Sequence, residues 1–206
     1  MRTLFCGITA SLLLASAIGA QNLLTNPSFE EPDVAPGTAQ IFAGNIAGWT
    51  DSSSCGIEVQ DNCCGSPSDG SQHVELDSDC SSTISQTVST TPGAKYVLTF
   101  DFSPRPGVVD NRLVVRWNGV QIFDELAAGA PPPADTDWNA HAIGVTATGT
   151  TSTVEFEDGS FSSPGVGTYI DHLPEPGRST ALLAGLAMIV GLATQHRKSH
   201  AGGAPR

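Results

Sequence analysis

The chain has 206 residues, with 21 Asp or Glu against nine Lys or Arg and a formal net charge of −12. Between Gln21 and Leu173 the imbalance is stronger, because twenty acidic residues face only four basic ones. Nucleic-acid binding needs a basic footprint, so this charge argues against that class of function and is typical of a soluble extracellular surface.

The first twenty residues have the three parts of a secretory signal peptide. Arg2 supplies the positive charge, Ile8–Ile18 is apolar apart from small residues, and cleavage is predicted near Ala20. The segment 21–173 that follows has the length of one domain.

The body alternates apolar and polar residues with the period of a β-strand. In Lys95–Phe102, the side chains of Tyr96, Leu98, Phe100 and Phe102 share one face. No segment shows a sustained helical period, and Gly, Pro, Ser and Thr punctuate the body throughout. Strands are therefore expected where this pattern recurs, at 56–59, 73–76, 83–88, 95–102, 113–117, 120–123, 138–147, 152–156 and 167–172.

One turn can be predicted with its type. Asn118-Gly119 separates two apolar runs, and both residues accept the positive φ of a type I′ hairpin turn. Loops are expected at 31–47, 61–71 and 127–137. Eight to ten short strands without helices predict an all-β, two-sheet antiparallel sandwich of the jelly-roll type.

Four cysteines remain in the body, and an even number in an exported protein predicts two disulfides. Three pairings are possible, and a Cys63–Cys64 bond would strain the peptide between them. We expect Cys63 and Cys64 to bond separately to Cys55 and Cys80. A zinc site is the alternative, but it lacks the paired Cys-x₂-Cys spacing.

The order of several segments resembles that of galactose-binding-like jelly-roll domains, which occur in bacterial surface proteins and carbohydrate-binding modules. These segments, which cover nearly the whole body, are 22–30, Gly48-Trp49, 73–77, 84–88, 96–101, 105–107, 115–119 and 169–171. The resemblance implies that Glu30 and Asp171 lie close together and hold one structural calcium, a cation that prefers carboxylate oxygens. The alternative is that both are exposed carboxylates at strand ends.

His73, Glu75 and Asp77 alternate and so project from one face of a strand. Such a row could bind a metal ion or a sugar hydroxyl, but we interpret it as a solvated face opposite Val74 and Leu76. Arg105 and Arg112 are scarce cations that we expect to pair with neighbouring carboxylates rather than to bind a ligand.

A sugar ring stacks well on an exposed indole, so the three tryptophans are the candidate glycan contacts. Trp117 alternates with core residues, and the resemblance implies a structural role for Trp49. Trp138 follows a proline-rich loop and is the expected ligand-binding residue.

Enzyme chemistry has little support in the sequence. The body histidines, His73, His141 and His172, are not near a nucleophile signature. Because acidic residues are many, a pair of carboxylates of the glycosidase type is compatible with the sequence. We therefore expect a non-enzymatic surface or matrix protein, with a carbohydrate-binding module and a small glycan-active enzyme as the two alternatives.

The C-terminus, 174–206, has three successive parts: Pro174-Glu175-Pro176, an apolar stretch at about 179–194 and a basic cluster at 196–198. This order resembles the PEP-CTERM sorting signal. The resemblance implies a transmembrane helix that holds the precursor at the inner membrane, cleavage by an exosortase-type enzyme, and release to a cell surface or exopolysaccharide matrix. A buried C-terminal helix and an anchor that is never cut are the alternatives.

Overall fold

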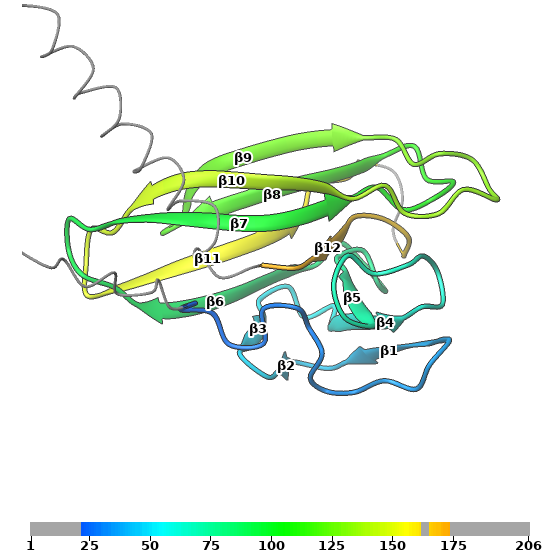
Figure 1. The fold of residues 1–206 in the computed structure, drawn as a ribbon, viewed down its shortest axis with the longest axis horizontal. Coiled ribbons are helices and arrows are strands. Elements are labelled where there is room, and N and C mark those ends of the chain that lie inside the picture. The colour runs from blue at the N-terminus through cyan, green and yellow to red at the C-terminus, as the bar shows by residue number, and fades with distance from the viewer. Residues whose placement is uncertain (1–21, 162–164, 174–206) are drawn as a thin grey trace, which may run out of the picture.

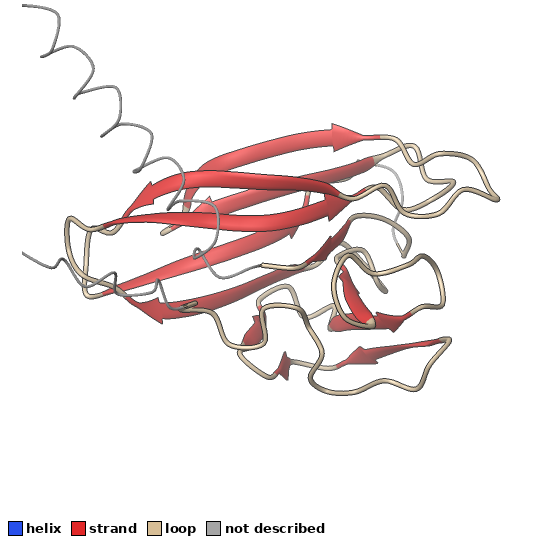
Figure 2. Ribbon diagram, viewed as in Figure 1, coloured by secondary structure: helices blue, strands red, loops and turns tan. Residues whose placement is uncertain are grey.

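Twelve strands make up the part of the chain that the computed structural model describes, residues 22–161 and 165–173 (Figure 1). No helix occurs among these residues (Figure 2), and so none there is long and apolar enough to cross a membrane. The strands are β1 (Thr38–Phe42), β2 (Asn45–Ile46), β3 (Trp49–Asp51), β4 (Ile57–Asp61), β5 (Gln72–Glu75), β6 (Thr83–Ser89), β7 (Lys95–Ser103), β8 (Asn111–Trp117), β9 (Val120–Ala127), β10 (Asn139–Thr146), β11 (Thr151–Asp158) and β12 (Tyr169–Asp171).

Both predicted targeting segments lie outside the described residues. These are the signal peptide at 1–20 and the tail at 174–206 with its Pro174-Glu175-Pro176 motif.

The strands form two six-stranded sheets, which we call sheet A and sheet B. Sheet A has the order β1-β4-β5-β12-β7-β10, and sheet B has the order β2-β3-β6-β11-β8-β9. Neighbouring strands are antiparallel throughout. The prediction of an all-β, two-sheet antiparallel sandwich is confirmed.

Aromatic side chains from both sheets meet in the core between the sheets. Phe156 of β11 packs edge-on against Trp49 and Phe100, with ring centroids 5.9 and 5.3 Å apart. Phe29, which precedes β1, lies 5.2 Å from Trp49. The alternation in β7 is confirmed, because Leu98, Phe100 and Phe102 are buried in this core.

The predicted hairpin between β8 and β9 is also confirmed. Asn118 and Gly119 have φ values of 51° and 75°, which are the left-handed conformations that a type I′ turn requires. The turn places Trp117 opposite Val120.

The expected loop 31–47 instead contains β1 and β2, and β3 follows directly after it. β1 pairs with β4 at the edge of sheet A, and four of its five residues are exposed. An edge strand exposed in this way needs no apolar alternation, so its sequence carries no period-2 signal.

The two ends of the described domain lie side by side. The Leu173 amide donates to the Pro27 carbonyl at 3.0 Å, and the Asn22 side-chain amide donates to the Leu173 carbonyl at 2.9 Å. Hydrogen bonds therefore join the first and last described residues of the domain.

Phe156→Ala should lower the free energy of unfolding by about 3–5 kcal/mol, because it leaves a cavity in contact with both Trp49 and Phe100. Phe161→Ala is the matched control, since that ring is 78% exposed and its loss should cost less than about 1 kcal/mol. Urea denaturation of both variants measures the difference. Equal losses would contradict the placement of Phe156 in the core.

Candidate functional site

Two loops are joined over the outer face of sheet A, and we call their junction the loop clasp. The backbone amide and hydroxyl of Ser66, in the β4–β5 loop, donate to the two carboxylate oxygens of Asp135 at 2.8 and 2.6 Å. In return, Thr136 Oγ1 and Trp138 Nε1 donate to the Ser66 carbonyl at 2.7 and 2.8 Å. Hydrogen bonds from the Ser66 hydroxyl and amide lower the pKa of Asp135 to about 2, so this carboxylate stays charged.

The sequence pattern predicts a solvated face for His73, Glu75 and Asp77. That interpretation is wrong, because all three residues are fully buried. The opposite side of the strand is also buried, since Val74 and Leu76 belong to the core. Loops that pack onto a sheet from distant parts of the chain override the rule that polar alternation faces water.

The Glu75 carboxylate is held by donors from three other segments. Arg105 Nη1 donates to both of its oxygens, at 2.6 and 2.8 Å, and the Gly167 amide donates at 2.6 Å. Gln60 Nε2 is a further donor. Burial raises the pKa of Glu75 to about 7 despite the adjacent guanidinium. The expected pairing of Arg105 with a carboxylate is confirmed, as is that of Arg112, which binds Asp124 through two hydrogen bonds of 2.7 Å.

His73 sits between two aromatic rings. Its ring centroid is 4.6 Å from that of Tyr169 and 5.7 Å from that of Trp138, both edge-on. Neither ring nitrogen has a hydrogen-bond partner among the described residues. Burial, followed by the nearby Arg105, lowers the pKa of His73 to about 4, so the imidazole is neutral at physiological pH.

Glu30 and Asp171, the predicted calcium ligands, bind neighbouring parts of one loop. Asp171 Oδ2 accepts the amides of Ser68 and Asp69 at 2.7 and 2.9 Å. Glu30 Oε1 accepts the amides of Ser71 and Gln72, each at 3.0 Å. A cation would have to share these oxygens with N–H donors, and no group of three or more potential metal ligands occurs in the described part of the chain. Calcium at Glu30 and Asp171 stays a prediction.

Of the three tryptophans, Trp138 is the most accessible. Trp49 is fully buried and Trp117 is 9% exposed, as predicted for structural residues, whereas Trp138 is half-buried. Its indole nitrogen is fixed by Ser66, and its ring and that of His73 meet in a T-shaped arrangement. Along β10, the residues after Trp138 that point away from the core are small, namely Ala140, Ala142 and Gly144. The indole therefore stands at one end of a surface of small side chains, Ala140, Ala142 and Gly144, which we call the β10 shelf.

Among the described residues there is one disulfide, Cys55–Cys80, and Cys63 and Cys64 carry free thiols. The predicted bonds from Cys63 and Cys64 to these two residues are wrong. Cys55 precedes β4 and Cys80 follows β5, so both lie at the open end of this hairpin, while Cys63 and Cys64 lie in its loop. A strand of five residues separates them by about 13 Å or more, well beyond the reach of a disulfide.

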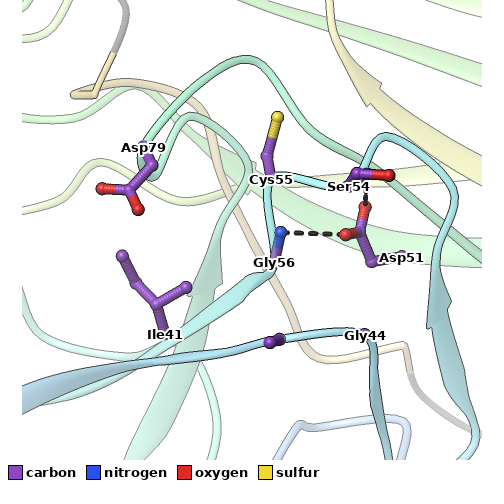
Figure 3. A pocket seen from close by; sticks show the side chains of 8 residues that line it. Ile41, Gly44, Asp51, Ser54, Cys55, Gly56 and Asp79 are labelled. Carbon is purple, nitrogen blue, oxygen red and sulfur yellow. Dashed lines mark hydrogen bonds between the residues drawn. The ribbon is translucent and has the colours of Figure 1, made fainter.

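An open pocket adjoins the disulfide, between β1 and the loop after β3 (Figure 3). Its volume of about 610 Å³ is in the range of small-ligand sites. However, the Asp51 carboxylate in its wall already accepts the amides of Ser54 and Gly56 at 3.2 and 2.8 Å. Burial opposes ionisation of Asp51, but these and other hydrogen bonds hold its pKa below the usual range. The Asp51 carboxylate oxygens are therefore occupied by hydrogen bonds that fix the turn around Cys55.

Residues 22–173 match the family described as "Protein of unknown function (DUF642)". The chain belongs to the DUF642 family. No curated protein matches it.

Several solved structures are similar to this DUF642 chain. A Stig cyclase from Fischerella sp. TAU is 14% identical, with a TM-score of 0.50, over 72% of this chain and 94% of that one. A family 35 carbohydrate-binding module from Clostridium thermocellum is 14% identical, with a TM-score of 0.40, over 65% of this chain and 95% of that one. The adhesin domain of Lys-gingipain from Porphyromonas gingivalis is 12% identical, with a TM-score of 0.47, over 65% and 94%. At such identities the likeness concerns the fold alone.

Ser66 and Gln60 both have central roles that the sequence pattern does not indicate. Ser66 joins the two loops, and Gln60 lies opposite His73 in the β4–β5 pair and bonds to Glu75. No local pattern marks either residue, since their partners lie far away in the sequence.

Gly70→Ala should destabilise the protein by about 2–3 kcal/mol. A Cβ atom there would come within 2.3 Å of Glu30 Oε1, and the φ of +64° is unfavourable for alanine. Gly93→Ala is the control, because its φ of +78° carries the same backbone cost but its Cβ would meet nothing within 4 Å. Thermal and urea unfolding compare the two. A Gly70→Ala loss no larger than the control would show that Glu30 does not hold this loop.

His73→Phe should reduce the loss of stability in acid. The unfolded chain takes up a proton on His73 near pH 6.5, whereas the folded chain does so only near pH 4. Stability is thus lost as pH falls through this window, by up to about 3 kcal/mol. As the pH falls from 7 to 4.5, the free energy of unfolding of the variant should therefore rise relative to that of wild type. The opposite slope from Glu75 is present in both proteins, and parallel pH profiles would refute the prediction.

Proposed function

We propose that this DUF642 protein is an exported, non-enzymatic component of a cell surface or exopolysaccharide matrix, and that it binds polysaccharide through the face of Trp138. The observation that carries the proposal is the half-exposed indole, fixed by the loop clasp at the edge of the β10 shelf. A pre-positioned aromatic ring offers a flat apolar surface for a sugar ring at little entropic cost. We also assign the sandwich to the galactose-binding-like jelly rolls.

Export is supported by the Cys55–Cys80 disulfide, which is typical of proteins in oxidising compartments. The signal-peptide pattern at 1–20 agrees with it. The PEP-CTERM-like tail at 174–206 then predicts a transient stay at the inner membrane and cleavage by an exosortase-type enzyme near Pro174–Pro176.

A binding role fits the charged side chains of sheet A better than catalysis does. Ser68 Oγ donates to Asp101 Oδ2, and His172 Nδ1 lies 3.3 Å from the same oxygen. This order places the carboxylate between the hydroxyl and the imidazole, whereas activation of a serine requires the imidazole to contact the hydroxyl. Glu75 and Asp171 are committed to Arg105 and to backbone amides, so they support the fold rather than a reaction.

Trp138→Ala should weaken binding of the exported protein to host exopolysaccharide by about tenfold or more, because it removes the aromatic anchor. Affinity electrophoresis and a glycan array measure this. Phe161→Ala is the control, since it removes another exposed ring, one that packs against Arg112 of β8 in sheet B. Circular dichroism and thermal unfolding verify that both variants are folded.

Three outcomes would contradict this proposal. Wild-type protein could bind no polysaccharide, Trp138→Ala could bind as wild type does, or both variants could lose binding equally. Release of reducing sugar from a polysaccharide panel would favour the glycan-active enzyme instead. An intact C-terminus in the mature protein would refute processing at 174–176.

A further inference from the structure

Cys63 and Cys64 are neighbours in the chain and their sulfur atoms lie 3.1 Å apart. Both are half-buried in the β4–β5 loop, and neither is part of the Cys55–Cys80 disulfide. The Cys64 carbonyl accepts a hydrogen bond from the hydroxyl of Tyr169 at 3.4 Å, so the pair sits directly over the covered polar face of sheet A. Two thiols in this arrangement need only about a 1 Å approach to bond.

No other cysteine of the body can serve as a partner. Cys55 and Cys80 are bonded to each other at the far end of the β4–β5 hairpin. Any disulfide that Cys63 or Cys64 forms within the domain must therefore join these two residues.

We propose that Cys63 and Cys64 are a modification site, where oxidation forms a vicinal disulfide beside the loop clasp. One thiolate attacks a disulfide-containing oxidant, R–S–S–R, and releases the first RSH as a mixed disulfide forms. The second thiolate then attacks the mixed disulfide and releases the second RSH. The two protons lost from the cysteines leave on the two RSH molecules, and the two electrons reduce the oxidant's S–S bond.

The bond would stiffen the β4–β5 loop, whose Ser66 holds the Trp138 indole. Cys64 is two residues from Ser66, whose carbonyl binds both Thr136 and Trp138. Closing a small ring at 63–64 limits the conformations of this loop before it packs. The proposal rests on the proposed export only in that an oxidising compartment would supply a natural oxidant. It does not depend on polysaccharide binding.

The vicinal bond should also be the more easily reduced of the two disulfides. Adjacent Cα atoms are about 3.8 Å apart, below the roughly 4.4–6.8 Å of ordinary disulfides. The intervening peptide must therefore distort, and strained disulfides have more oxidising potentials. Cys55–Cys80 has a Cα separation of 5.6 Å and lacks this constraint.

The experiment uses the purified full chain and peptide mass spectrometry. Burial and the adjacent Cys64 sulfur raise the pKa of the Cys63 thiol to about 12, which leaves little thiolate at neutral pH. The reduced protein is therefore incubated with excess oxidised glutathione at pH 9, where the thiolate fraction is about a hundredfold larger than at pH 7. Remaining thiols are alkylated in denaturant, and the chain is cut before its aspartates. Cleavage before Asp61 and Asp69 releases residues 61–68, which contain Cys63, Cys64 and no other cysteine.

The expected result is an unalkylated 61–68 peptide about 2 Da lighter than the dithiol, because two hydrogens are lost. A stepwise dithiothreitol titration should open this bond before Cys55–Cys80. Cys64→Ser is the matched control and should give one alkylated or glutathionylated cysteine in the same peptide.

Recovery of peptide 61–68 with two alkyl groups, or with glutathione on both cysteines, would overturn the proposal. A bond from Cys63 or Cys64 to Cys55 or Cys80 would overturn it as well. The same peptide from protein isolated directly from its host, with thiols trapped at lysis, separates the two proposals. There, a reduced Cys55–Cys80 pair counts against export, while oxidised Cys55–Cys80 beside two free thiols at 63–64 counts against the vicinal bond.

Discussion

The outer half of the molecule depends on the hydrogen bonds and the ion pair made by the buried carboxylate of Glu75. Arg105 reaches it from the β7–β8 loop, Gly167 from the β11–β12 loop, and Gln60 from β4. One side chain thus connects four segments that are remote in the sequence. Because a buried charge without partners is costly, each donor must occupy its place for the folded state to be stable.

This constraint gives sheet A a second, polar layer. Its inner face packs Val59, Val74 and Ile170 into the aromatic core, while its outer face carries Gln60, His73 and Tyr169 beneath the two loops. The loop clasp at Ser66 closes this layer and fixes the Trp138 indole at its margin. The residues nearest the proposed binding site therefore serve two purposes, since they complete the fold and orient a half-buried aromatic ring.

The four described cysteines divide between the two ends of the β4–β5 hairpin. Cys55–Cys80 closes the open end, next to the Asp51 turn, and Cys63 and Cys64 occupy the loop. The even count and the narrow window indicated a disulfide-bearing segment, but they do not reveal pairing. Pairing depends on which residues a strand brings within reach, and β4 separates the two pairs.

The sequence by itself determined the two-sheet sandwich, most of its strands, the Asn118-Gly119 turn and the core face of β7. These features depend on local propensity and period, which neighbouring residues encode. It also indicated that Arg105 and Arg112 pair with carboxylates and that Trp138 is the most accessible tryptophan. The edge strand β1, the burial of His73, Glu75 and Asp77, the Cys55–Cys80 bond and the role of Ser66 were decided only by tertiary structure. Each of them arises from contacts between segments that are distant along the chain, so no local pattern could specify them.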